Sequence, residues 1–254
     1  MAVIAVFNQK GGVGKTTTCL NVAASLAMLG RNPLAIDLDP QAHLSLACGI
    51  SAVNASESIS AFYRDEKSLE ELIRHLATGL RLIPSNLDLS KVDALLGKST
   101  SVAARLKKGL EAKLAWEESP VLIDCCPMLG VLSLNALFAA DRVLIPVSAD
   151  YLSMQGVHRL DAALNVLEGP LKRKIERKVV ITRFDARRKL AHEMFGQLKE
   201  RYGANLCETR ISENVNLAES PAHGQDIFAY APNSQGSQDY GALTMELLTK
   251  GFFE

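Results

Sequence analysis

The chain has 254 residues, of which 48% are apolar and 22% are charged, a composition typical of a soluble globular protein of enzyme size. Its 28 basic and 28 acidic residues cancel, so any affinity for nucleic acid has to come from a local patch of charge. No apolar run approaches the roughly 18 residues of a membrane span, and five cysteines without metal-ligand spacing favour free thiols in a reducing, cytoplasmic setting.

Short apolar runs alternate with helical patterns along the whole chain. The runs predict strands buried on both faces of a parallel sheet, over residues 3–7, 34–38, 80–84, 121–125, 143–147 and 178–182. The stretches between them predict helices over 15–29, 69–77, 102–116, 130–140, 153–167 and 187–202. This alternation indicates one α/β domain, residues 1–254, with a mostly parallel twisted sheet and helices on both faces. The polar stretch 51–71 is predicted to be a surface excursion within that domain.

The first predicted strand leads into a phosphate-binding loop that reads K-G-G-V-G-K-T-T. Its glycines let backbone N–H groups curl around an anion, and the helix that follows adds the positive end of its dipole. Lys15 is expected to lie along the β- and γ-phosphates of ATP, Thr16 to complete a Mg²⁺ shell, and Thr17 to donate to the α-phosphate. The predicted nucleotide-binding residues are Lys10, Gly11, Gly12, Val13, Gly14, Lys15, Thr16 and Thr17.

This loop resembles the deviant phosphate loop of the ParA/MinD ATPases, relatives of the nitrogenase iron protein, because Gln9 and Lys10 stand where the general pattern begins with glycine. The resemblance covers nearly the whole chain and is greatest for ParA-like ATPases that position cargo. It continues in D-L-D-P-Q (37–41), V-L-I-D-C (121–125), L-N-A-L (134–137), P-V-S-A-D-Y (146–151), R-I-S-E-N-V (210–215) and S-Q-D-Y (237–240).

The resemblance implies a P-loop NTPase that hydrolyses ATP with Mg²⁺ as a homodimer. It implies that Lys10 reaches the phosphates bound by the other subunit, while Lys15 serves the nucleotide of its own subunit. An extra cation near the γ-phosphate would stabilise the charge that develops in phosphoryl transfer and would tie dimerisation to ATP.

Three aspartates follow predicted strands. Asp37 and Asp39 stand where open α/β sheets bind ligands, at the carboxyl end of the second strand. The resemblance gives Asp39 the task of orienting the attacking water in contact with the metal shell, and gives Asp124 a water-mediated hold on Mg²⁺. A strand-end aspartate is often only a helix cap, and this alternative stays open, above all for Asp37. Cys126 replaces a proline common in relatives, and is either a redox-sensitive thiol or a small buried residue.

A basic segment, residues 170–189, is the predicted DNA-binding surface. Its nine basic and two acidic residues concentrate positive charge in a neutral chain, as expected of a protein that contacts the phosphate backbone without sequence preference. A solvated connection between helix and strand is the alternative. Relatives commonly have a basic residue where Asn216 stands, in a region that contributes to DNA binding. The predicted contact residues are Arg183, Arg187, Arg188, Lys189, Lys199 and Arg201.

The predicted function is that of a ParA-like ATPase that forms a sandwich dimer on ATP and binds nonspecific DNA over the nucleoid. It would position a plasmid, a chromosome or a protein assembly, and a ParB-like or other adaptor protein would stimulate hydrolysis. The alternative is a nucleotide-dependent switch that docks proteins and never touches DNA.

Other activities of this fold are not expected. The adjacent Cys125 and Cys126 lack the ligand spacing of an iron–sulfur protein, and the segment 243–253 has Lys250 as its only base, too few for a MinD-type membrane helix. That segment is expected to be a final helix packed on the sheet. A tyrosine kinase would carry a tyrosine cluster in its tail, and an amidating synthetase would need a glutaminase domain.

Overall fold

A computed structural model describes residues 2–95, 100–113 and 119–254 of the chain. Eight strands form one sheet in the order β3-β4-β2-β5-β1-β6-β7-β8, and all neighbours are parallel except β3 and β4. This confirms the predicted α/β fold with a mostly parallel sheet. The strands are β1 (Val3–Val6), β2 (Leu34–Leu38), β3 (Arg74–His75), β4 (Arg81–Ile83), β5 (Val121–Cys125), β6 (Arg142–Ser148), β7 (Glu176–Phe184) and β8 (Leu206–Ser212).

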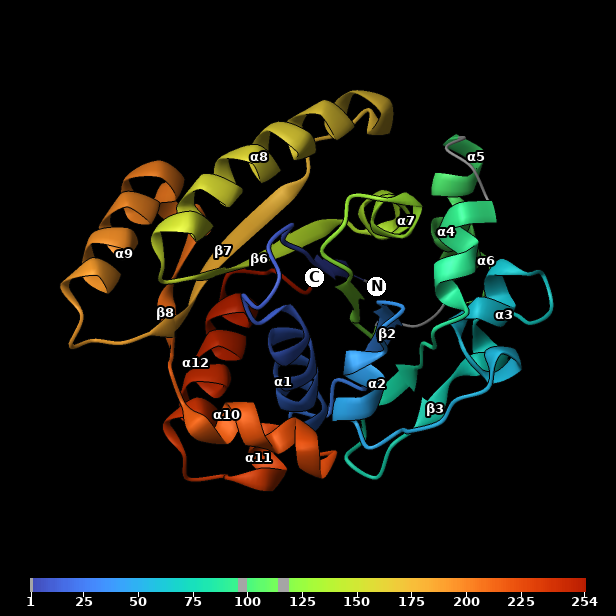
Figure 1. Ribbon diagram of the computed structural model, residues 1–254, viewed down its shortest axis with the longest axis horizontal. Helices are drawn as coiled ribbons and strands as arrows, with labels where there is room; N and C mark the ends of the chain where they lie inside the picture. The colour runs from blue at the N-terminus through green and yellow to red at the C-terminus, as the bar shows by residue number, and fades with distance from the viewer. Residues whose placement is uncertain (1, 96–99, 114–118) are drawn as a thin grey trace.

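Helices cover both faces of the sheet (Figure 1). Helices α1 and α12 lie on one face, and α7, α8 and α9 lie on the other. In the part of the chain that is described, no helix has the length and apolar character to cross a bilayer. The α-helices are α1 (Lys15–Met28), α2 (His43–Ala47), α3 (Ile59–Tyr63), α4 (Leu89–Leu95), α5 (Thr100–Ala103), α6 (Arg105–Lys113), α7 (Val131–Ala139), α8 (Tyr151–Leu171), α9 (Lys189–Tyr202), α10 (Val215–Glu219), α11 (Ile227–Tyr230) and α12 (Gln235–Thr249).

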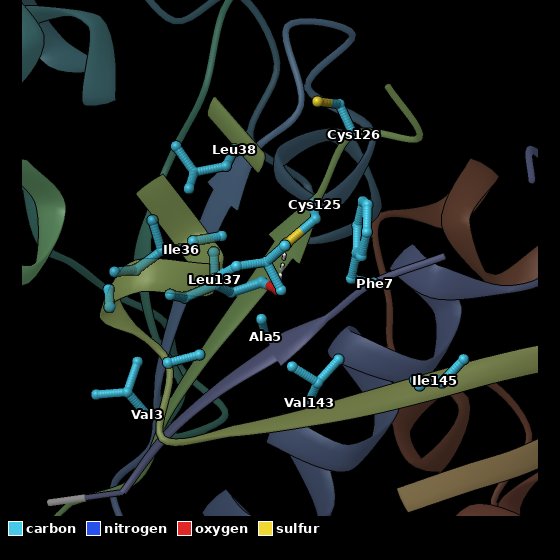
Figure 2. Packing of buried hydrophobic residues seen from close by; sticks show 14 of the residues in the cluster. Val3, Ala5, Phe7, Ile36, Leu38, Cys125, Cys126, Leu137, Val143 and Ile145 are labelled. Carbon is cyan, nitrogen blue, oxygen red and sulfur yellow. Dashed lines mark hydrogen bonds between the residues drawn. The ribbon is translucent and has the colours of Figure 1, made fainter. Parts of the chain in front are cut away.

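Each central strand supplies two hydrophobic cores, because successive side chains of a strand point to opposite faces. Val3 and Ala5 of β1 pack in the core under α7, α8 and α9, whereas Ile4 and Val6 pack in the core under α1 and α12. Figure 2 shows part of the first core, with the thiol of Cys125 among the apolar side chains. Burial on both faces explains why these strands are continuously apolar in the sequence.

The prediction of a helix over residues 69–77 is wrong. Only Glu70–Leu72 forms a 3₁₀ turn, and the residues after it form β3, which pairs antiparallel with β4. The Leu76 N–H donates to the Leu80 carbonyl at 2.9 Å across the connecting turn, where Gly79 has a φ of 82°. The apolar spacing suits a helix, but this glycine lets the chain reverse and extend the edge of the sheet.

Three further predictions about the elements need correction. The stretch 51–71 is more than a surface excursion, because its helix α3 buries Ile59 and Tyr63 in the core. The helix predicted over 102–116 is divided into α5 and α6, and residues 114–116 lie outside the described residues. Strand β8 was not predicted, because its mixture of buried, partly buried and exposed residues differs from the continuous apolar runs of the central strands.

Strand β8 forms one edge of the sheet, and a carboxylate from α12 covers part of it. Glu246 accepts hydrogen bonds from the backbone N–H groups of Glu208 and Thr209, both at 2.8 Å, and from Lys250 Nζ at 2.6 Å. Burial raises the pKa of Glu246, but these hydrogen bonds outweigh it and lower the pKa to about 2 from an ordinary 4.5. The final helix therefore stabilises the edge strand through a charge as well as through apolar packing.

We expect this contribution to disappear in acid. The folded state holds Glu246 ionised down to a pKa of about 2, so the stabilisation is complete above the unfolded pKa of 4.5 and is lost as pH falls from there through 2. Glu246→Gln should lower the free energy of unfolding by roughly 2 kcal/mol at pH 7, after allowance for screening by water, and by less than half of that at pH 3. Urea unfolding at both pH values would measure this, with Glu193→Gln on the solvent-facing side of α9 as the control. An equal loss at both pH values would contradict the assignment.

Candidate nucleotide site

The candidate site is centred on the loop between β1 and α1. Gly12 and Gly14 have φ values of 73° and 85°, in the left-handed region that favours glycine, and they turn the chain so that α1 begins at Lys15. Gly14 occupies the N-cap position of α1 without offering a side chain, so the first N–H groups of the helix remain available to an anion. The hydroxyl of Thr182, on β7, donates to the Val13 carbonyl at 2.9 Å and holds the loop in place.

The two lysines of the loop have different partners. Lys15 is 7% exposed, and its ammonium donates to the Lys10 carbonyl at 2.9 Å, which places the charge inside the loop. Burial lowers the pKa of Lys15, although the carboxylate of Asp124 opposes this effect. The ammonium of Lys10 instead lies at the start of α8, where it donates to Asp150 at 2.6 Å and to the Ser153 hydroxyl at 2.9 Å.

Asp150 is a functional candidate that the sequence analysis missed. It is the N-cap of α8, and it accepts from the Ser153 N–H at 3.0 Å and from the Ser148 hydroxyl at 2.5 Å. Burial raises its pKa, but the hydrogen bonds from Lys10, Ser148 and Ser153 outweigh burial and lower the pKa to about 2. The motif P-V-S-A-D-Y marked this position in the sequence, but only as part of a resemblance. Lys10 is thus held by an ionised carboxylate of its own chain.

Asp37 and Asp124 end the neighbouring strands β2 and β5 and lie in register. Asp37 is fully buried and accepts from the N–H and the hydroxyl of Ser45, at 2.8 Å and 2.7 Å, and from the N–H of Asp39 at 3.1 Å. Burial raises the pKa of Asp37 to about 6 against these hydrogen bonds. Its contacts tie β2 to the first turn of α2, which favours the capping alternative for this residue.

The two carboxylate oxygens of Asp124 differ in their hydrogen bonding. Its Oδ2 accepts from the Thr16 hydroxyl at 2.7 Å, whereas its buried Oδ1 has no hydrogen-bond partner among the described residues. Burial and the neighbouring charge of Asp37 raise the pKa of Asp124 well above its usual range. An unbonded carboxylate oxygen beside a hydroxyl fits Mg²⁺, which prefers oxygen ligands. Within residues 2–95, 100–113 and 119–254, no cluster of three His, Cys, Asp or Glu could hold a metal, so Mg²⁺ here would depend on phosphate and water oxygens as well.

A cavity of about 980 Å³ opens over the loop and is lined by Lys15, Thr16 and Thr17, whereas Asp37, Asp124 and Asp150 lie behind its walls. Asp39 lies on its wall, where its Oδ1 accepts from the Gln41 N–H at 2.9 Å. The far wall comes from the segment around β8 and α10, including Ile211, Asn214 and Leu217, which the sequence analysis did not assign to the site. The cavity is large enough for a nucleotide, with the polar loop at one side and a more apolar wall at the other.

Cys126 lines the same cavity while Cys125 does not. Figure 2 shows Cys125 among the core side chains and Cys126 at the end of the strand. The sulfur of Cys126 lies 3.3 Å from the Ser133 hydroxyl and 3.7 Å from the Met128 carbonyl, and the residue is 9% exposed. These contacts favour the alternative in which Cys126 is a small buried residue.

The six predicted DNA-contacting residues do not form one surface. Arg187, Arg188 and Lys189 lie together at the turn from β7 to α9, and their side chains are 89%, 72% and 92% exposed. Lys199 lies ten residues further along α9, roughly 15 Å away, and pairs with Glu208 at 3.2 Å. Arg183 is separate again, next to the phosphate loop.

Arg201 is exposed but is held in an ion network whose carboxylate, Asp161, is largely buried. Its guanidinium donates to Asp161 of α8 at 3.0 Å and 3.2 Å. Asp161 also accepts from the Tyr202 hydroxyl at 2.6 Å and from Arg177 of β7 at 3.3 Å. Arg177 of the basic segment therefore pairs with Asp161, together with Arg201, in a network that connects α8, β7 and α9.

Comparisons with known proteins match nearly the whole chain. An AAA domain family model matches residues 1–177. The chain is 34% identical to the sporulation initiation inhibitor protein Soj of Bacillus subtilis over 251 residues, 98% of this chain and 99% of Soj. It is also 34% identical to the chromosome partitioning protein ParA of Myxococcus xanthus over 250 residues, 98% of this chain and 88% of that protein.

Two solved structures illustrate the structural similarity. Cobyrinic acid a,c-diamide synthase from Mycobacterium smegmatis, with bound ADP and magnesium, has a TM-score of 0.84 at 27% identity, over 99% of this chain and 96% of that chain. A putative plasmid partition protein from Borrelia burgdorferi, bound to AMPPNP, has a TM-score of 0.81 at 24% identity, over 98% of this chain and 99% of that chain. The latter likeness bears on the fold alone.

Proposed function

Because the chain belongs to the ParA/MinD/Soj family of ATPases, we propose that it is a single-domain ATPase that dimerises on ATP with one nucleotide sandwiched per subunit. The dimer binds nonspecific DNA and positions or segregates a cargo, and a ParB-like or other adaptor protein stimulates hydrolysis. The cycle thereby couples the occupancy of the nucleotide site to attachment to the nucleoid.

The observation that supports dimerisation most directly is the placement of the two lysines. Lys15 points into its own loop, whereas Lys10 is held at the start of α8 by Asp150 and Ser153. The side chain of Lys10 is 31% exposed, so it can exchange Asp150 for the phosphates of a second subunit. Such an exchange replaces one charge-assisted hydrogen bond by another, and its cost is therefore small.

The residues around the loop have different roles in phosphate binding, metal binding and hydrolysis. Lys15 and the N–H groups at the start of α1 bind the phosphates, and Thr16 with Asp124 would hold Mg²⁺. When bound, Mg²⁺ would neutralise charge that develops on the phosphate oxygens. Asp39, on the cavity wall, orients the attacking water. Lys10 of the partner subunit completes the cation set at the γ-phosphate.

Asp39→Ala should leave ATP binding intact and slow hydrolysis by at least tenfold, so that the ATP dimer accumulates. The reason is that Asp39 stands on the cavity wall and accepts from the N–H of Gln41, whereas the proposed phosphate ligands belong to the loop before α1. Steady-state phosphate release and light scattering with Mg-ATP would measure both effects. Asp88→Ala, at the exposed residue directly before α4, serves as the control. If Asp39→Ala hydrolysed ATP at the wild-type rate, the water-orienting role would be wrong.

DNA binding is proposed through the exposed cluster Arg187, Arg188 and Lys189. Binding should require ATP, because a dimer presents the cluster twice. It should also weaken steeply with salt, because the logarithm of the binding constant falls with the logarithm of the salt concentration by about 0.9 for each phosphate contact. The test is DNA binding with ATP, ADP and no nucleotide at low and moderate salt. Replacing the three residues by alanine should weaken binding and reduce the slope, whereas Lys199→Ala should not. If the ATP dimer failed to bind DNA at low salt, positioning over the nucleoid would be untenable.

The structure also supports a second candidate, a nucleotide-dependent switch that docks proteins without DNA. Arg201 is tied to Asp161 and Lys199 to Glu208, so only part of the predicted basic surface is available. Exposed apolar residues near the cavity, Met128 and Leu129, could instead contact a protein. The same DNA titration separates the two candidates.

A further inference from the structure

A β-bulge interrupts β7 beside the phosphate loop. Ile181 pairs with Arg210, and Phe184 pairs with Ser212, so β7 advances by three residues where β8 advances by two. Within the bulge, Arg183 has a φ of 52°, in the left-handed region that a residue with a side chain rarely adopts. Strain of this kind persists only where the surrounding structure enforces it, and it concentrates at functional sites.

The bulge directs Arg183 toward the phosphate loop. Its Nη1 donates to the Gly12 carbonyl at 3.5 Å, and its Nε lies 3.7 Å from Oε1 of Glu213. Arg183 and Glu213 both line the cavity that contains Lys15 and Thr16. A basic side chain from β7, the second strand from β1 in the sheet, thus reaches the rim of the cavity.

The contacts of this guanidinium leave it able to bind an anion. A guanidinium has five N–H donors in a planar fork that matches a phosphate, and the Gly12 carbonyl engages one end of it. The contact with Glu213 is long, and both side chains are more than half exposed, so water screens the pair strongly. A nucleotide phosphate in the cavity would offer a shorter, bidentate partner.

We propose that Arg183 is a nucleotide-binding residue of this protein, whose guanidinium leaves Glu213 and binds the phosphate chain of the nucleotide held in the same cavity. The inference rests on the proposed nucleotide site and deepens it. It also assigns Arg183 to ATP rather than to DNA. Arg187 and Arg188, which follow it closely in the chain, point to solvent and pair with Asp185 instead.

Arg183→Gly tests this assignment, because it removes the guanidinium while glycine adopts the positive φ without strain. ATP and ADP should bind about tenfold more weakly, because one charge-assisted hydrogen bond is lost. The melting temperature without nucleotide should equal or exceed that of the wild type. Calorimetric titration without DNA and at constant salt would measure the affinities. Arg183→Lys should restore part of the loss, and Glu213→Gln, which removes the competing carboxylate, should strengthen binding.

The matched control is Arg187→Ala, on the same connection but outside the cavity, which should bind both nucleotides as the wild type does. Wild-type affinity in Arg183→Gly, or an equal loss in Arg187→Ala, would overturn the proposal. Lys15→Ala separates this failure from that of the proposed function. If Lys15→Ala loses ATP binding and Arg183→Gly does not, only the role of Arg183 is wrong, whereas full ATP affinity in Lys15→Ala would place the nucleotide elsewhere.

Discussion

Lys15→Ala should reduce the affinity for ATP by about a hundredfold or more and abolish measurable hydrolysis. The ammonium of Lys15 is buried inside the loop and bonded to the Lys10 carbonyl, so its removal takes away the central positive charge that faces the phosphates. Hydrogen bonds to charged groups contribute about 1.5–3 kcal/mol each, and a phosphate chain accepts more than one of them. Calorimetric titration with Mg-ATP and a phosphate-release assay would measure both losses.

The same substitution should not destabilise the protein without nucleotide. Burial lowers the pKa of Lys15, which means that the folded chain holds this charge at a cost. We therefore expect Lys15→Ala to melt at the wild-type temperature or above it, and to lose the increase in melting temperature that ATP causes by mass action. Lys91→Ala on the surface of α4 should keep that increase. An increase in Lys15→Ala equal to the wild type would contradict the role of the loop.

Lys10→Ala should bind ATP as the wild type does and yet lose the ATP-dependent dimer and most of its turnover. Its ammonium contacts Asp150 and Ser153 rather than the inside of the loop, so the subunit's own nucleotide does not depend on it. A dimer interface that loses a charged contact to a buried phosphate typically loses 2–5 kcal/mol. Light scattering with a non-hydrolysable ATP analogue would give the dimer fraction, and titration calorimetry the affinity.

The matched variant for Lys10 is Asp150→Asn, which frees the ammonium and keeps its charge. It should retain the ATP-dependent dimer, because the competing partner of Lys10 is weakened and the phosphates of the other subunit are unaffected. If Lys10→Ala formed the dimer as readily as the wild type, its role in trans would be excluded. Lys10 would then be a residue that only anchors the loop to α8.

Local sequence patterns determined the fold class and the position of the phosphate loop. The continuous apolarity of β1, β2 and β5 reports burial on both faces, and the glycines of the loop report positive φ angles, as in Gly12 and Gly14. Both signals arise from neighbours in the chain. The hairpin of β3 and β4 and the edge strand β8 escaped this approach, because one depends on a turn at Gly79 and the other on partial exposure.

Only the tertiary structure decided which residues meet across the sheet. The strand order brings Thr16 to Asp124, and it brings Lys10 to Asp150, although 108 and 140 positions separate these pairs in the chain. A bulge between β7 and β8 brings Arg183 to the loop, and Asp161 of α8 pairs with Arg201 of α9. Residue spacing encodes the period of a strand or helix, but strand order, register and ion pairing arise from contacts between distant segments. The basic residues, which look like one patch in the sequence, are therefore divided among the wall of the cavity, an exposed turn and an ion network between α8, β7 and α9.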